Sequence, residues 1–187
     1  RRRRWPPVSK ACGRVRGKRV VPRRGKSADR PVKKADLRHG GAMQIAVIAD
    51  THDRLPADLA ERLRGADEIW HLGDVCAPET LVELELLGVP LRVVRGNCDA
   101  HPWPLTLDVK LEGHRAHLVH IPPRRSPPGA ELVLHGHTHV PRDEIDPLGV
   151  RWLNPGCITR PNRGAPAAFA WLALEQGSPP HWAPERL

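Results

Sequence analysis

Apolar and polar positions alternate in blocks after a long polar segment, and the blocks predict strands and helices in turn. Three short apolar runs, at 43–49, 67–73 and 90–96, are typical of buried strands. Between them lie two segments with helical spacing, at 56–65 and 77–88, each with proline near its start and glycine at its end. A βαβαβ order favours a sheet that is parallel at its centre and covered by helices.

The pattern then changes to short strands joined by turns. Two runs, at 105–112 and 114–121, predict a hairpin around Gly113. Further strands are expected within 131–136, 143–154 and 167–175. The last ten residues are rich in proline, and we expect them to fray. The sequence therefore predicts an α/β fold with a mixed two-layer sheet arrangement and flanking helices.

Residues 1–42 have no sustained apolar period, so they cannot bury enough surface to offset the entropy lost on ordering. They carry 16 Lys and Arg against 2 Asp and Glu, whereas the rest of the chain carries 14 against 19. The formal net charge of +9 therefore comes from this segment alone. We interpret it as a basic disordered extension preceding a single domain at 43–187.

Three interpretations of the extension stay open. It resembles an arm that binds nucleic acid, an Arg-rich transit peptide, or a stretch upstream of the true start at Met43, the only methionine. We favour the last of these.

Composition argues against two classes of protein. No stretch reaches the roughly 18 apolar residues of a membrane-spanning helix, so no membrane partner is expected. The four cysteines form no CxxC pair and follow no secretory leader, so a disulfide scaffold is not expected either. We infer a reducing, cytoplasmic location.

Polar side chains follow five successive predicted strands. They are Asp50 and His52 after the first strand, Asp74 after the second, Asn97, Cys98 and Asp99 after the third, His120 at the end of the hairpin, and His137 and His139 after the next strand. Taken singly, each group is an ordinary turn or a solvated side chain. Because ligands of α/β folds bind beyond the carboxyl ends of strands, the convergence predicts one functional site.

Imidazole and carboxylate groups without a thiolate set are ligands for divalent transition metals. The candidates are Asp50, His52, Asp74, Asn97, His120, His137 and His139. These are too many for one ion. Two ions roughly 3.5–4 Å apart, bridged by a carboxylate, clamp the attacking and leaving oxygens of a phosphoryl transfer.

The motifs DTH, GDVC, GNCD, a lone His120 and GHTH, in this order, resemble the five signatures of the calcineurin-like metallophosphoesterases. The match is closest to their small one-domain bacterial and archaeal phosphodiesterase branch, which is related to the retromer scaffold subunit. It covers about Met43 to Leu174 and implies a four-layer α/β/β/α sandwich with mixed sheets. By position it implies one metal at Asp50, His52 and His139, a second at Asn97, His120 and His137, and Asp74 as the bridge.

The resemblance also implies an activity. The expected reaction is hydrolysis of a phosphoester, preferably a phosphodiester, by in-line attack of a metal-bridging hydroxide. Two divalent cations are the implied cofactors, preferably Mn²⁺, with Fe, Zn, Ni and Co also suited. Asp74, Asn97 and His120 are thereby catalytic residues. Cys98 stands where many members have a general-acid histidine, and a thiol with a reference pKa of about 8.5 is poorly matched to proton delivery near pH 7.

The sequence departs from the family in two places. Ile121 replaces the usual glycine after the lone histidine, and the link at 122–130 is too rich in proline for the usual helix. We therefore expect a shorter, more open wall beside the site. Arg124 and Arg125 on this link could meet a substrate phosphate, although a solvated loop is the simpler interpretation.

Neighbouring residues have expected supporting roles. Asp53 and Asp99 could orient ligand histidines, His135 could line the rim, and the NPG turn at Asn154–Gly156 could shape the adjacent loop. If another residue protonates the leaving group, the candidates are His71, His101 and His135.

Rival functions come from other classes. A non-catalytic protein-interaction scaffold of the same fold would be favoured by a lost ligand, and no ligand position is lost here. A nucleic-acid binder would act only through the basic extension. The expected partner is a small phosphoester substrate, and an oligomer is compatible with the sequence.

Overall fold

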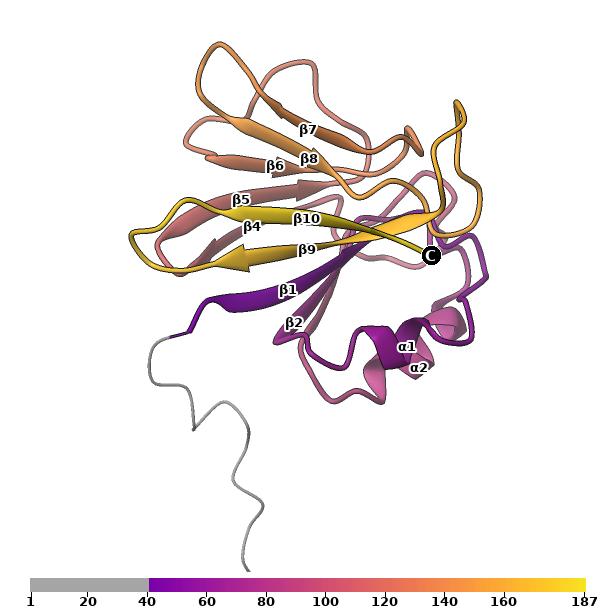
Figure 1. Cartoon of the computed structure of the whole chain (residues 1–187). Helices are drawn as coiled ribbons and strands as arrows, with labels where there is room; N and C mark the ends of the chain where they lie inside the picture. Colours follow the sequence, from indigo (N-terminus) through magenta and orange to yellow (C-terminus); the bar gives the residue numbers. More distant parts are fainter. Residues whose placement is uncertain (1–40) are drawn as a thin grey trace, which may run out of the picture. The chain divides into compact units, whose positions relative to one another are not determined.

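Two five-stranded sheets form the frame of the protein in the computed structural model, which describes residues 41–187. The predicted basic extension therefore lies almost wholly outside the described residues. Strand order is β10-β9-β1-β2-β3 in one sheet, called sheet A here, and β4-β5-β6-β8-β7 in the other, sheet B. The two sheets are stacked, and the helices lie on the sheet A side (Figure 1).

Sheet A contains the predicted parallel strands, but they form one side of the sheet and not its centre. Its strands are β1 (Met43–Ile48), β2 (Glu68–His71), β3 (Leu91–Val93), β9 (Ala168–Leu174) and β10 (His181–Arg186). The first three pair in parallel, whereas β9 runs antiparallel to β1 and β10 antiparallel to β9. The carboxyl ends of β1, β2 and β3 therefore meet at one edge.

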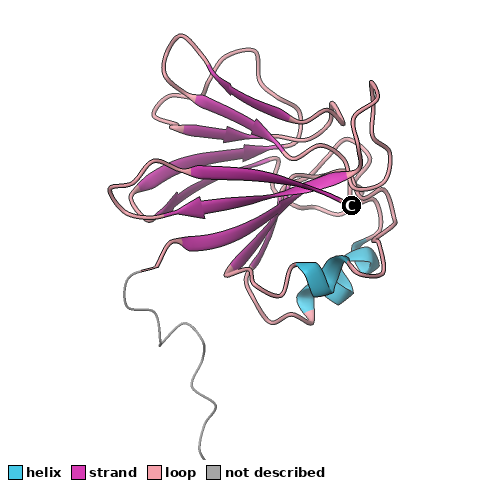
Figure 2. Ribbon diagram, in the orientation of Figure 1, coloured by secondary structure: helices cyan, strands magenta, loops and turns pink. Residues whose placement is uncertain are grey.

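The helices are shorter than the predicted segments. They are α1 (Leu59–Arg62), the 3-10 helix η2 (Pro78–Leu81) and α2 (Val82–Glu85). No side chain caps the N-terminus of any of them, so burial of Leu59, Leu81 and Leu84 holds these single turns. Figure 2 shows how small the helical share of the described chain is.

Sheet B contains the predicted hairpin. Its strands are β4 (Thr106–Leu111), β5 (His114–Val119), β6 (Leu132–Leu134), β7 (Arg142–Ile145) and β8 (Arg151–Asn154). The antiparallel pair β4–β5 turns at Gly113, whose φ is +82°. Strands β5, β6 and β8 run parallel to one another, so sheet B is mixed as well.

Alternation along β1 explains the layers. Ile45 and Val47 point into a core shared with sheet B, whereas Ala46 and Ile48 point into a second core formed with the helices. A small third cluster around Trp152 covers the outer face of sheet B. In the part of the chain that the structure describes, no helix lies over that face, because the link at 122–130 is irregular. The outer helical layer expected of a four-layer sandwich is therefore not found there.

The expectation of a frayed C-terminus is wrong. β10 pairs with β9 along its whole length, and Trp182 is buried in the core between the sheets. Pro184 is compatible with the strand because β10 is the edge of its sheet.

Among residues 41–187, no helix has the length and apolar character needed to cross a membrane.

Candidate metal centre

The candidate ligands lie on loops that leave the strands in an unusual conformation. Five of them have positive φ angles: Asp50 (58°), His52 (45°), Asp74 (57°), His137 (67°) and His139 (57°). Residues other than glycine reach this region at a cost of about 1–3 kcal/mol each. The loops after β1 and β2 hold each other, since Asp50 N–H donates to Gly73 O and His52 N–H to Asp74 O, both at 3.0 Å.

One group of donors gathers around Asp50. Its Oδ1 lies 3.3 Å from His139 Nε2, which in turn lies 3.3 Å from His52 Nε2. Asp50 is fully buried, and burial raises the pKa of its carboxyl to about 6. Asp50, His52 and His139 could together hold a metal ion.

A second group gathers around Asn97. Its Oδ1 lies 3.1 Å from His120 Nε2 and 2.9 Å from His137 Nδ1. These spacings suit a metal, because ligand atoms about 2.1 Å from one ion and at right angles are about 3 Å apart.

Asp74 lies between the two groups. Its Oδ1 is 3.3 Å from His120 Nε2, and its Oδ2 is 3.9 Å from His52 Nε2. Although burial opposes it, the neighbouring His120 imidazole and the hydrogen bond from Cys98 N–H hold the pKa of this carboxyl well below its usual range. Asp74 is therefore a carboxylate at neutral pH, with one oxygen for each group.

The tautomers of two histidines support a cation. Nδ1–H of His120 donates to Leu72 O at 2.8 Å, and Nδ1–H of His139 donates to Arg160 O at 2.5 Å. A carbonyl can only accept, so Nε2 of each neutral ring presents a lone pair. These lone pairs face Asn97 Oδ1 and Asp50 Oδ1. Acceptors that converge in this way repel one another unless a cation binds among them, so the donor set fits metal ions.

Asp99 and Asp53 do not orient histidines, contrary to the sequence-based expectation. Asp99 accepts the N–H groups of Asp74, Gly96 and Cys76 at 3.0, 2.6 and 2.7 Å, and Asp53 accepts Ala77 N–H at 2.7 Å. Both carboxylates hold the loop backbone.

Lack of space explains why a glycine occupies position 96. A Cβ there would lie 2.1 Å from Asp74 Oδ1, so only glycine lets the loop after β3 approach the carboxylate.

Asn154, from the NPG turn, donates to Gly136 O at 3.0 Å and to Thr138 Oγ1 at 3.1 Å. The NPG turn thus holds the GHTH loop, as expected.

Two of the three histidines considered as alternative acids are not placed to act on a substrate. His135 is 1% exposed and packs against Trp152 instead of lining the rim. His71 is fully buried, where it contacts Thr51 Oγ1 at 3.1 Å, and burial lowers its pKa to about 3. His101 is exposed, and its ring lies 4.4 Å from the ring of Trp103 at an angle of 46°.

Several supporting groups gave no signal in the sequence. Carbonyl oxygens of Leu72 and Arg160 fix two imidazoles, and a carbonyl group is present in every residue. Thr51 also showed no pattern, because a buried threonine after a strand is common.

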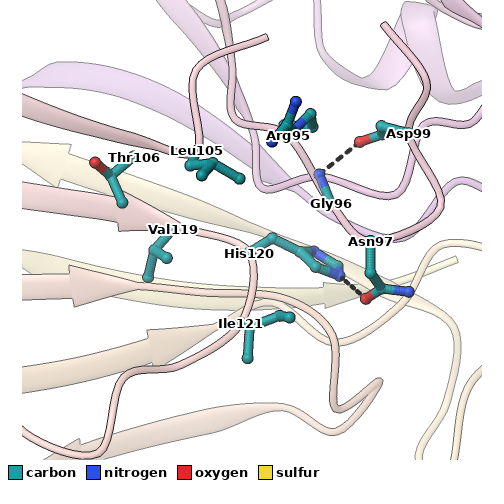
Figure 3. Close-up of a pocket in the computed structure, with 9 residues that line it drawn as sticks. All are labelled: Arg95, Gly96, Asn97, Asp99, Leu105, Thr106, Val119, His120 and Ile121. Atoms are coloured by element: carbon teal, nitrogen blue, oxygen red, sulfur yellow. Dashed lines mark hydrogen bonds between the residues drawn. The ribbon is translucent and has the colours of Figure 1, made fainter. Parts of the chain in front are cut away.

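A cavity of about 480 Å³ opens beside Asn97 and His120 (Figure 3). Its other lining residues are Arg95, Gly96, Asp99, Leu105, Thr106, Val119 and Ile121. The wall is largely apolar, and its charged groups are the guanidinium of Arg95 and the carboxylate of Asp99. Arg124 and Arg125 are exposed and do not line it.

Comparison with known proteins decides the family. A model of the calcineurin-like phosphoesterase superfamily domain matches residues 43–177. The chain belongs to the calcineurin-like phosphoesterase superfamily. The sequence-based assignment to this family is confirmed, and with it the assignment as a phosphoesterase. The prediction of two mixed sheets is confirmed as well.

Three relatives define the branch. A probable metallophosphoesterase from Methanothermobacter thermautotrophicus is 34% identical over 147 residues, which cover 68% of this chain and 84% of that protein. The structure of YfcE, a phosphoesterase from E. coli, matches with a TM-score of 0.61 and 27% identity, over 70% of this chain and 88% of that one. Vacuolar protein sorting 29 from Cryptosporidium parvum has the same fold, with a TM-score of 0.62 and 20% identity, over 78% and 98% of the two chains. The chain thus lies in the small phosphoesterase branch related to that protein, a family whose members bind metal ions.

Proposed function

We propose that the protein hydrolyses phosphodiesters at a centre of two divalent metal ions. The observation that carries this proposal is the position of Asp74, whose two oxygens face two separate groups of donors. The first ion would be held by Asp50, His52 and His139, the second by Asn97, His120 and His137, and Asp74 would contact both.

When bound, a metal pair supplies an activated water and neutralises negative charge on the phosphoryl group. The chain's own residues prepare this chemistry. Asp74 and Asp50 are the two buried carboxylates that oppose the cationic charge, and hydrogen bonds to the carbonyls of Leu72 and Arg160 aim the imidazoles of His120 and His139 inward. Asp99 fixes the backbone of Asp74 and Gly96, which keeps the bridging carboxylate in place.

The leaving group receives little help from acids. The residue Cys98 is exposed beside the proposed centre. Partial desolvation of its thiol, and secondly the neighbouring Asp74 carboxylate, raise the pKa of this thiol. His71 and His135 are too deeply buried to reach a substrate. We therefore expect substrates whose leaving oxygen needs little protonation, such as aryl esters.

The cavity beside Asn97 suits such a group. Leu105, Val119 and Ile121 offer an apolar wall for an aromatic ring, and Arg95 supplies a positive charge for a phosphate oxygen. Ile121, which replaces the glycine usual in the family, is half exposed and gives part of this surface.

The test is metal analysis combined with a phosphoester panel. Metal-depleted protein receives Mn²⁺, Co²⁺, Ni²⁺, Zn²⁺ or Fe²⁺ and is assayed on bis-p-nitrophenyl phosphate, p-nitrophenyl phosphate and an alkyl diester. We expect two Mn²⁺ ions per chain, and the highest rate on the aryl diester in the presence of Mn²⁺. Tight binding of a single ion, or no hydrolysis with any metal, would contradict the proposal.

A scaffold function is less well supported. The likeness to vacuolar protein sorting 29 shows the fold alone, and the complete donor set favours catalysis. Binding of nucleic acid through residues 1–42 stays a prediction, because residues 1–40 lie outside the described part of the chain.

A further inference from the structure

Three side chains gather beside the proposed metal pair, and of these only His52 is also one of its candidate ligands. His52 follows β1, Cys76 follows β2 and Cys98 follows β3, so three neighbouring strand ends contribute one residue each. One donor atom of each lies within 4.8 Å of the other two. Cys76 Sγ is 3.7 Å from His52 Nδ1.

The two edges of the His52 ring separate this cluster from the proposed centre. Nε2 faces His139 Nε2 at 3.3 Å and Asp74 Oδ2 at 3.9 Å. Nδ1 lies on the other side of the ring and faces Cys76. An ion bound by Nδ1 and the two sulfurs would therefore occupy a different position from an ion bound by Nε2.

The spacing fits a tetrahedral ion. With bonds of about 2.3 Å to sulfur and about 2.0–2.1 Å to nitrogen, tetrahedral ligands place S and N roughly 3.6 Å apart. The observed 3.7 Å needs almost no adjustment. Cys98 is exposed and Cys76 is partly exposed, so solvent can supply the fourth ligand.

We propose that His52, Cys76 and Cys98 form a thiolate-rich metal site that takes Zn²⁺ or another thiophilic divalent ion. Two thiolates and one imidazole are a soft donor set, unlike the oxygen-rich and nitrogen-rich set of the proposed catalytic pair. Binding releases the two thiol protons to solvent, together with any proton that Nδ1 of His52 carries. The site goes beyond the phosphoesterase function, and His52 is the only residue that it shares with the proposed centre.

The cluster is also linked to the proposed pair through the backbone. Cys98 N–H donates to Asp74 Oδ1 at 2.8 Å, and Asn97 Nδ2–H donates to Cys98 Sγ at 3.3 Å. An ion that draws Cys98 toward Cys76 will therefore also act on Asp74 and Asn97.

Cobalt titration of the full-length, metal-depleted and reduced protein tests the proposal, because thiolate bound to Co²⁺ gives a strong near-ultraviolet charge-transfer absorption. We expect this band in the wild type. It should vanish in the double variant Cys76→Ser with Cys98→Ser, which should also bind one fewer equivalent of cobalt. Cys12→Ser, at a cysteine outside the described residues, is the matched control and should keep the band.

Absence of the band in the wild type, or its persistence in the double variant, would overturn the proposal. If the double variant does not fold, alkylation of the wild type answers the same question. Zn²⁺ should protect Cys76 and Cys98 from iodoacetamide, and equal modification with and without Zn²⁺ would refute the site. A protein that fails to hydrolyse any phosphoester but shows the band would contradict only the proposed function.

Discussion

The carboxylate of Asp74 is the residue on which the proposed centre depends most. Its two oxygens face His120 and His52 separately, so an amide in its place would offer one weak acceptor and no charge. Asp74→Asn should lower phosphodiesterase activity by more than about 100-fold, since even the loss of a group that supports a ligand costs about 10–100-fold. Metal content should fall in parallel.

Asp108→Asn is the control for this change, because Asp108 lies on β4 and contacts His117. Both variants should be assayed with metal analysis. Two ions at full occupancy and wild-type activity in Asp74→Asn would show that the site has been assigned to the wrong residues.

Cys98 is the residue that should set the preference for leaving groups. A thiol is a weak hydrogen-bond donor, so the wild type should cleave aryl diesters much faster than alkyl ones. Cys98→His should raise the alkyl rate more than the aryl rate, by up to the roughly 10²–10⁴-fold typical of general acid catalysis.

Rates on matched aryl and alkyl diesters measure this effect, and Cys98→Ser serves as the control that adds no acid. Equal wild-type rates on the two substrates would mean that another group, for example a metal-bound water or His101, already supplies the proton.

The histidines show how much of the candidate site can be predicted from the sequence at the scale of single residues. His52, His120, His137 and His139 follow predicted strand ends, and the structure brings them together as expected. In the sequence, His135 cannot be distinguished from these candidate ligands, because it alternates with His137 and His139. It is buried instead because it directly follows β6, whose three residues are all buried, and packs against Trp152 from β8. Such cross-strand packing cannot be read from spacing.

At the scale of elements, strand β10 is where sequence analysis failed. Proline is a strong breaker in most strands, and so the last residues were expected to fray. The fold places β10 at the edge of sheet A, where one side of the strand needs no hydrogen-bond donor. Strand order across a sheet is a long-range property, and a local pattern does not contain it.

Trp182→Ala tests the contribution of β10. The side chain is 6% exposed and lies in the core between the two sheets. Its loss should lower the free energy of unfolding by about 3–5 kcal/mol, as for other buried aromatic residues replaced by alanine. Urea unfolding measures the effect.

His181→Ala, on the adjacent and exposed position of the same strand, should change stability by less than about 0.5 kcal/mol. Similar stabilities of Trp182→Ala and the wild type would mean that β10 contributes little to the fold in solution.

The two predicted helical segments were located correctly, but the lengths of their helices were overestimated. Proline and glycine mark where a helix begins and ends, yet they say nothing about how many turns will form between them. Here Leu59 and Leu84 need only a single turn to reach the core on sheet A.

At the scale of the whole molecule, buried neutral histidine makes stability depend on pH. Burial lowers the pKa of His71 to about 3, below the reference value of 6.5. As pH falls below 6.5, the unfolded chain therefore binds a proton at this residue that the folded protein does not. The stability from the neutral ring is complete above pH 6.5 and is progressively lost toward pH 3.

Between pH 6.5 and pH 5 the loss from one such histidine is about 2 kcal/mol. Chemical denaturation in the presence of a chelator, at several pH values, should show a smaller loss in His71→Gln than in the wild type. Comparing the two proteins cancels the opposing effect of Asp50, whose pKa is raised to about 6. Parallel pH profiles would contradict a neutral buried His71.

The basic segment should be separable from the domain. Both β1 and the family match begin at Met43, so we predict that a chain starting there keeps its fold, metal content and turnover of a small diester. Circular dichroism and the diesterase assay check this. Loss of folded protein would show that residues 1–42 contribute to the structure, and a steep salt dependence of nucleic-acid binding that disappears with them would support an arm.

Five proposed ligands have left-handed backbone conformations that side chains other than glycine adopt with difficulty. The proposed ligands therefore lower the stability of the fold that carries them. If activity were no longer required, glycine at these positions would relieve the strain while the two sheets stayed intact. A fold built in this way could lose its proposed chemistry and keep the architecture of its two sheets.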